Sequence, residues 1–280
     1  MDKTITFILL FIVLSGVAYY LWQEHETNLV LENAKPPPTV EPSTILPEVI
    51  EEEVHYPVVE QVLSTNNEKT DPPGQVIAEV LQLPSLNESD EVMQTVFSRI
   101  YAPLRLAEIF IFTEFARHFV VTVDNMTAKK LPQRLAFTHP PAGDLMVKKT
   151  ASEKEFLLDE INFGRYSRYM DFIDNVNDQE LVSIYTRYYP LFQEAYEELG
   201  YPGRYFNDRL ITVIDHLLQT PDVDESIKLV QPKVFYQFTN PELEKLSVGQ
   251  KILLRVGHKN ALRIKSRLVN LRHLLTTLGM

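Results

Sequence analysis

The chain has 280 residues, with 27 Lys and Arg against 38 Asp and Glu, and contains no Cys. The lack of Cys excludes a disulfide framework, a thiolate metal site, an iron–sulfur cluster and a cysteine nucleophile. None of the 9 glycines begins a G-x-G-x-x-G or Walker-type phosphate loop, and the net charge of -11 argues against nucleic acid as a partner.

Residues 1–26 are interpreted as an N-terminal membrane anchor. Residues 4–22 read TITFILLFIVLSGVAYYLW, and a helix of that length at ~1.5 Å per residue spans the ~30 Å hydrocarbon core of a bilayer. A cleaved signal peptide is the alternative, because Gly16-Val17-Ala18 resembles a cleavage site. The apolar run continues beyond that site to Trp22, which favours an uncleaved, single-pass transmembrane helix.

The charges that flank this span predict its orientation. Lys3 precedes the span, and the next basic residue after it is Lys35. Because cytoplasmic flanks carry an excess of Lys and Arg, we expect a cytoplasmic N-terminus and an exported C-terminal domain. In a bacterium this places the chain in the inner membrane, with the domain in the periplasm.

Residues 27–80 are predicted to be a disordered linker. They contain 8 of the 18 prolines, ten acidic residues against Lys35 and Lys69, and a single aromatic residue, Tyr56. Such a composition buries too little apolar surface to offset the cost of ordering. A spacer is the favoured role, and short apolar pieces such as Val58-Val59 leave a docking motif as the alternative.

Residues 81–280 are predicted to form a mainly helical domain of α+β class, with one or two small β-hairpins. Ser85 and Glu88 suggest a capping box before the first helix. Apolar residues recur at helical spacing from Phe112 to Val123. A hairpin is expected between Lys148 and Leu158, followed by a short helix.

The second half of this domain continues the helical pattern. A long apolar stripe runs from Leu181 to Leu199, and Pro190 within it predicts a kink or a split. Asn207-Asp208 is expected to cap the next helix. The remaining elements are two short strands, at 227–230 and 234–238, a helix starting at Asn240-Pro241, one with a Ser247–Gln250 capping box, and a last helix to about Leu278.

Five stretches of the domain resemble the bacterial domain of unknown function 3014. They are LPSLNESDEV (83–92), RHFVVTVDNM (117–126), YPLFQEAYEELGYPGRYFNDRLITVIDHLLQTP (189–221), LVQPKVFYQF (229–238) and LEKLSVGQKILLRVGHKNALRIKS (243–266). The resemblance covers roughly 83 to 275, and GYPGRYFNDR is its most specific piece. It implies a layout of membrane segment, linker and domain, but no activity, cofactor or catalytic residue.

The run from Gly200 to Arg209 is the first candidate binding surface. Glycines around a proline predict a tight turn that presents aromatic and charged side chains at a helix start. Tyr201 and Tyr205 could stack on a sugar or a peptide, and Arg204 with the helix-start amides could hold an anion. The alternative is structural, with Asn207 or Asp208 capping the helix and the aromatic rings packing.

A catalytic interpretation rests on Asp208, Asp215 and His216. The two aspartates are seven residues apart and share a helical face, so with His216 they could serve acid–base hydrolysis. A pair of this kind is a weak signal. No other His spacing suggests a metal site, and no cofactor is expected.

The C-terminal region is the second candidate surface. Residues 228–280 hold ten Lys and Arg against Glu242 and Glu244, whereas the folded part before them is acidic. Arg263, Lys265, Arg267 and Arg272 lie off the leucine stripe of the last helix and could attract an anionic partner. The alternative is a solvated face on a packed helix.

These observations support two functional hypotheses. The first is a membrane-tethered, non-enzymatic envelope protein whose exported domain binds a protein or a cell-wall component. The second is an envelope hydrolase acting on glycan or peptide through the Asp208, Asp215 and His216 region. Neither hypothesis involves nucleic acid.

Overall fold

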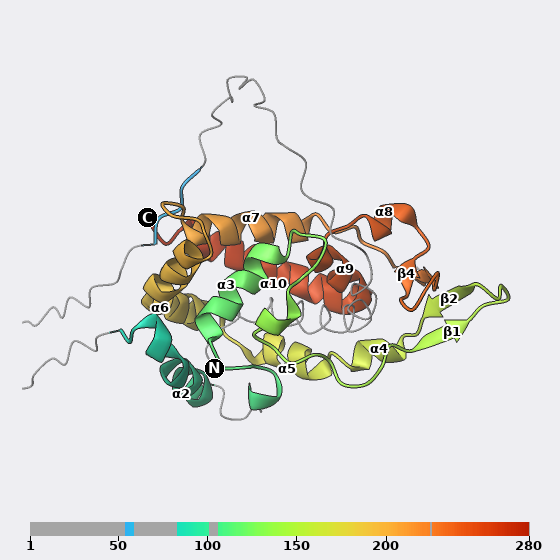
Figure 1. The fold of residues 1–280 in the computed structure, drawn as a ribbon, viewed down its shortest axis with the longest axis horizontal. Coiled ribbons are helices and arrows are strands. Elements are labelled where there is room, and N and C mark those ends of the chain that lie inside the picture. The colour runs from blue at the N-terminus through green and yellow to red at the C-terminus, as the bar shows by residue number, and fades with distance from the viewer. Residues whose placement is uncertain (1–53, 59–82, 101–105, 225, 280) are drawn as a thin grey trace, which may run out of the picture.

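The computed structural model describes residues 54–58, 83–100, 106–224 and 226–279 (Figure 1). These residues are mostly helical, with nine α-helices and one small antiparallel sheet, as predicted. The predicted transmembrane span lies outside them, and none of the helices they form has the length and hydropathy needed to cross a bilayer.

The helices and strands follow one another along the chain as follows. The helices are α2 (Ser89–Ile100), α3 (Phe115–Asn125), α4 (Ile161–Gly164), α5 (Ser167–Asn175), α6 (Asp178–Glu198), α7 (Phe206–Leu218), α8 (Pro241–Glu244), α9 (Val248–Arg255) and α10 (His258–Thr276). The strands are β1 (Val147–Lys149), β2 (Glu155–Leu158), β3 (Lys228–Val230) and β4 (Gln237–Phe238). Short 3₁₀ turns lie at Leu86–Glu88, Leu106–Glu108 and Gln133–Leu135.

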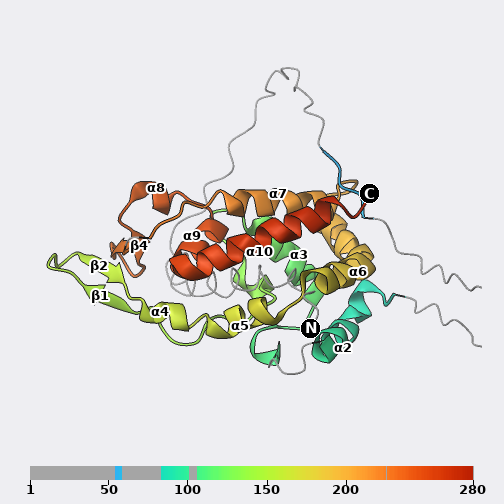
Figure 2. The same cartoon turned by 180° about the vertical axis from the view of Figure 1, so that it is seen from behind.

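The helical body is built around α3, α6, α7 and α10. Helix α10 packs along α7 and α6, and α3 packs on α6 and α7, as the two opposite views show (Figures 1 and 2). The apolar faces predicted from periodicity meet in this core, where Phe119 contacts Phe192 and Phe206 at centroid distances of 5.1 and 5.8 Å. Burial of these large rings dominates the stabilisation of the body.

The two predicted hairpins join into a single sheet with the order β1-β2-β3-β4. Phe156 of β2 pairs with Lys149 of β1 on one side and with Leu229 of β3 on the other. Leu229 then pairs with Phe238 of β4. The sheet covers a second, smaller apolar core, made by Leu158, Ile227, Leu229, Phe238 and Leu254. This shared core explains why the hairpins pair rather than standing apart.

Three local predictions need correction. Pro190 lies inside α6, which continues to Glu198, so the predicted split is wrong; the buried face simply continues through Leu191 and Phe192. The Ser85 hydroxyl donates to the Glu88 carboxylate at 2.9 Å and makes no cap bond to the backbone. The capping box of Ser247 and Gln250, by contrast, is present at the start of α9.

The third correction concerns the start of α7. The helix begins at Phe206, so Asn207 and Asp208 lie within its first turn and neither side chain caps it. Instead Gln193 of α6 accepts the Phe206 N–H at 2.9 Å through its Oε1 atom. A side chain from a neighbouring helix has taken the capping role, which leaves Asn207 and Asp208 available for other contacts.

Residues 54–58 lie against the helical body, although the sequence places them in the linker predicted to be disordered. The segment runs past the start of α7 close to the C-terminal end of α10 (Figure 1). Tyr56 and Val58 pack on the main core and are partly buried. The prediction of disorder is therefore corrected for these five residues, because an aromatic and an apolar side chain find a place on the domain.

Candidate functional site

The turn before α7 sets the geometry of the first candidate site. Gly200 and Gly203 have φ values of 109° and 76°, which lie in the left-handed region that glycine adopts readily. The Gln193 side chain holds the turn against α6 by donating to the Arg204 carbonyl at 2.8 Å and accepting from Phe206. The turn therefore presents the first residues of α7 in a fixed position.

Asn207 and Asp208 together hold the main chain of Tyr56. The Tyr56 N–H donates to Asp208 Oδ1 at 2.8 Å, and the Tyr56 carbonyl accepts from Asn207 Nδ2 at 2.9 Å. Asn207 is fully buried and its Oδ1 accepts from the Tyr185 hydroxyl at 3.2 Å, which fixes the orientation of the amide. Both hydrogen-bonding groups of one residue are thus bound by two adjacent side chains.

The side chains of the segment make further contacts. His55 pairs with Asp208 Oδ2 at 2.8 Å and lies on the Tyr205 ring with centroids 3.9 Å apart. The guanidinium of Arg272 has a raised pKa, first because it hydrogen-bonds Asp215 and also because of the neighbouring Tyr56 side chain. A cavity of about 480 Å³ remains beside the segment and is lined by the segment together with α7.

Pro57 closes the segment against the end of the chain. A Cβ atom placed on Gly279 would lie 2.6 Å from Pro57 Cγ, so the two residues approach as closely as a glycine permits. The segment therefore lies between the start of α7 and the residues that follow α10.

The predicted surface is only partly assembled. Tyr205, Asn207 and Asp208 meet on the segment, and Arg204 lines the cavity with no ion pair to any residue that the structure describes. Tyr201 has a structural role instead: its ring stacks on Tyr196 at 4.6 Å and its hydroxyl donates to Asp124 at 3.2 Å. These contacts give Tyr201 a structural role, and its predicted stacking on a ligand stays a prediction.

Sequence reasoning missed the segment and its support from α3. Arg209 holds α7 to α3 through Asp124, with Nε and Oδ1 2.7 Å apart. His55 and Tyr56 were assigned to the linker. The usable signal was that Tyr56 is the single aromatic residue of 27–80, since an isolated aromatic residue in a polar stretch is a frequent anchor.

The hydrolase hypothesis required Asp208, Asp215 and His216 to converge. Asp208 binds the segment, Asp215 forms a two-point ion pair with Arg272 at 2.5 and 3.0 Å, and His216 Nε2 lies 2.8 Å from Ser247 Oγ. Burial lowers the pKa of His216, and Arg209 and Lys129 add to the effect. Asp208 and Asp215 line the same cavity, but His216 is not among the residues that line it, so the three groups do not converge as an acid–base set. The described residues also hold no cluster of three His, Asp or Glu suited to a metal ion.

The basic face of α10 is paired with carboxylates from the acidic part of the domain. Arg263 pairs with Asp174, Lys265 with Asp222 at 2.5 Å, Arg267 with Asp178 at 3.1 Å, and Arg272 with Asp215. Lys265 lowers the pKa of Asp222 by hydrogen bonding to it. These cations are paired within the chain, which favours the alternative of a solvated face on a packed helix, and an anionic partner for α10 stays a prediction.

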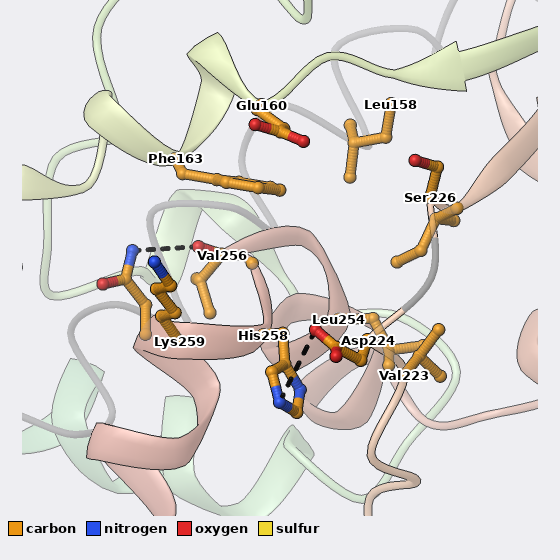
Figure 3. A pocket seen from close by; sticks show the side chains of 13 residues that line it. Leu158, Glu160, Phe163, Val223, Asp224, Ser226, Leu254, Val256, His258 and Lys259 are labelled. Carbon is orange, nitrogen blue, oxygen red and sulfur yellow. Dashed lines mark hydrogen bonds and ion pairs between the residues drawn. The ribbon is translucent and has the colours of Figure 1, made fainter.

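A second cavity, of about 530 Å³, lies between α4, the approach to β3 and the junction of α9 and α10 (Figure 3). Its apolar wall includes Leu158, Phe163 and Leu254, while Glu160 and His258 lie on opposite sides of it (Figure 3). Asp224 lies 3.9 Å from His258 but is largely exposed. Charges of both signs line this cavity, so its chemistry does not select one class of ligand.

Comparison with known proteins gives a family but no activity. The model of a family described as "Protein of unknown function (DUF3014)" matches residues 115–272, from α3 into α10. This match lies within the stretch over which the sequence resembles that family. No curated protein and no solved structure matches the chain.

Proposed function

The chain belongs to the DUF3014 family, and since the family description assigns no activity, we propose a function from the geometry: the domain is a protein-binding module. Its site is the start of α7, where it takes a short, irregular segment of a partner protein. The module is non-enzymatic.

The observation that carries this proposal is the binding of Tyr56 by Asn207 and Asp208. A backbone N–H at 2.8 Å from one side chain and a backbone carbonyl at 2.9 Å from the next form a paired contact that any peptide can make. Charge-assisted and amide hydrogen bonds of this kind contribute about 1 to 3 kcal/mol each. Main-chain contacts give affinity, and the neighbouring rings and Arg272 supply side-chain selection.

A protein segment suits this site better than a glycan or other cell-wall component. In the structure the donor and the acceptor that the two side chains bind are the main-chain N–H and C=O of a single residue, Tyr56. The Tyr205 ring, 50% exposed, stacks on an imidazole and has no second aromatic partner among the described residues that would form a sugar platform. The cell-wall alternative is therefore the weaker candidate.

The cellular setting of the proposal follows from the sequence. The apolar span at 4–22, the acidic linker and the charge bias of Lys3 support a bacterial inner-membrane protein with its domain in the periplasm. Protease treatment of spheroplasts checks this arrangement: we expect the domain to be digested without lysis, and a domain that resists until lysis contradicts the exported topology.

Selection of displayed random peptides tests the binding site directly. The target is the full-length chain in detergent with Tyr56→Ala, which removes the ring that packs on the main core and so weakens the hold of the segment on the start of α7. We expect enrichment of peptides with an aromatic residue, and loss of that enrichment when Asp208→Ala is added. Enrichment that survives Asp208→Ala, or none at all, refutes the proposed site.

A further inference from the structure

We infer that residues 54–58 are a built-in competitor, which closes the site at the start of α7 until a partner segment with a tyrosine displaces it. This inference rests on the proposed function and adds the regulation of the same site. It concerns Val54-His55-Tyr56-Pro57-Val58 of the same chain.

The first support is that the segment occupies the hydrogen-bonding groups of Asn207 and Asp208. Asp208 uses both of its carboxylate oxygens, one on the Tyr56 N–H and one on the His55 ring, at 2.8 Å each. The side-chain amide of Asn207 donates to the Tyr56 carbonyl. A partner segment cannot make these contacts while the chain's own segment makes them, so the two compete for the same atoms.

The second support is the composition of the segment against its surroundings. Tyr56 is the single aromatic residue of 27–80, and acidic residues flank the segment at Glu53 and Glu60. Ordering a stretch of this kind costs about 1 to 2 kcal/mol per residue in backbone entropy. The docked part is the apolar and aromatic part, which is where burial can offset that cost.

The third support is the length of chain that links the segment to the domain. The 24 residues from 59 to 82 connect Val58 to Leu83, so the segment meets its site within one chain, at an effective concentration that does not depend on the concentration of the protein. A segment with weak intrinsic affinity is then bound most of the time. The apparent affinity of a partner falls in proportion to the fraction of open sites.

The contacts also define the chemistry of the partner. Its segment needs a tyrosine whose N–H and C=O are free of secondary structure, because Asp208 and Asn207 take both. The ring occupies the partly buried place of Tyr56 near the Arg272 guanidinium. A following proline fits the close approach to Gly279, where a Cβ atom placed on the glycine would lie 2.6 Å from Pro57 Cγ.

Fluorescence anisotropy with a labelled peptide tests the inference. The probe is EEVHYPVVE, which corresponds to residues 52–60, and the receptor is the full-length chain in detergent micelles. We expect Tyr56→Ala in the receptor to bind the probe at least about tenfold more tightly than the unmodified chain, since a tenfold gain corresponds to about one open site in ten. Val234→Ala is the control, because Val234 is 51% exposed and lies between β3 and β4, away from the segment and the start of α7, and it should bind like the unmodified chain.

Further variants and probes in the same experiment distinguish failure of the inference from failure of the proposed function. Adding Asp208→Ala to Tyr56→Ala should abolish binding, and so should a probe with Ala in place of its tyrosine. Equal probe affinity in the unmodified and Tyr56→Ala chains, both lost with Asp208→Ala, overturns the competitor while the peptide site stands. Failure of Tyr56→Ala to bind the probe overturns the site itself. The tighter binding of Tyr56→Ala could also vanish when the receptor is diluted. In that case the docked segment comes from a second copy of the chain, and closure within one chain is overturned.

Discussion

Two adjacent residues, Asn207 and Asp208, form the site because another residue caps α7 in their place. Their residue types favour a helix cap, and their position in the sequence predicted one. Because Gln193 of α6 accepts the Phe206 N–H, the first turn of α7 is satisfied without them. Asp208 and the buried Asn207 then extend their polar groups to the main chain of Tyr56. A residue pattern typical of capping thus becomes a peptide-binding pair.

His216 predicts a pH dependence of stability. Burial lowers its pKa from the ordinary 6.5, so the unfolded state binds a proton more readily than the folded state. The contribution of His216 to the free energy of unfolding is therefore complete above about pH 6.5, and it is lost as the pH falls through the lowered pKa of the folded state. We expect urea unfolding to show a smaller free energy at pH 5.5 than at pH 7.5, and His216→Gln to reduce that difference.

His118 is the control for this prediction, because burial lowers its pKa as well and gives the same sign. His118→Gln should remove a separate part of the pH dependence, and the two effects should add, since the residues lie on different helices. An unchanged pH dependence in His216→Gln contradicts the assignment.

At the scale of the elements, Gly257 controls the junction between α9 and α10. Its φ of 91° is unfavourable for other residues, and a Cβ placed there would lie 2.7 Å from the Phe163 ring. We expect Gly257→Ala to lower the free energy of unfolding by about 2 to 4 kcal/mol, from backbone strain and overpacking together. Thermal and urea denaturation measure it.

Gly164→Ala is the matched control for Gly257→Ala. Gly164 ends α4, has no positive φ, and a Cβ there would meet nothing within 4 Å. We expect a change within about 0.5 kcal/mol, or a slight gain. A similar loss at both glycines contradicts the role given to Phe163.

The ion pairs of α10 differ in what they contribute. Arg267 and Asp178 are 24% and 12% exposed, and Arg267 also donates to the carbonyls of Ile173 and Val176 at the end of α5. Arg267→Ala removes the cation beside a mostly buried carboxylate together with two hydrogen bonds to backbone carbonyls, and we expect a loss of about 2 to 3 kcal/mol in urea unfolding.

Arg263 provides the comparison for Arg267. It pairs with Asp174, but both side chains are more than 40% exposed, so water replaces the pair easily. Arg263→Ala should change the unfolding free energy by less than about 1 kcal/mol. Equal losses in the two variants contradict the difference in burial.

Sequence patterns predicted the elements better than their contacts. Periodicity located the apolar faces of α3, α6 and α7, because a buried helical face leaves a repeat of 3.6 residues. The pairing of β2 with β3 was not predictable, since it joins Phe156 to Leu229 across four intervening helices and both strands are very short. The candidate site was not predictable for the same reason, because the contact of Tyr56 with Asn207 joins residues 151 positions apart.

At the scale of the whole molecule, the charge of -11 conceals an internal pairing. The four cations off the leucine stripe of α10 bind carboxylates that come from α5, α6, α7 and the segment after α7. The opposite charges of the two parts of the domain therefore serve to dock α10 on the earlier helices. Most of the net negative charge in the sequence belongs to residues 27–80, which carry ten acidic residues and two lysines.

The two apolar cores of the described residues predict unequal local stability. The small core under the sheet is built from five buried residues, whereas the main core contains the large aromatic rings of α3, α6 and α7. Regions with few buried contacts open at lower free energy than the rest of a protein. We expect native-state hydrogen exchange to show this for the Leu158 amide, which donates to Ile227, and the Thr239 amide, which donates to Lys228.

Amides in the middle of α6, such as those of Tyr185 and Phe192, are the reference for the main core, because both rings are fully buried. In low urea the free energy of opening should be at least about 2 kcal/mol smaller for the sheet amides than for the amides of α6. Its dependence on urea should also be smaller, because the local opening exposes less surface. Leu254 of α9 is the buried residue of the small core that lies in the helical body, so Leu254→Ala should widen that gap. Merging of the two sets of amides into one opening with one urea dependence shows instead that sheet and helices unfold as a single unit.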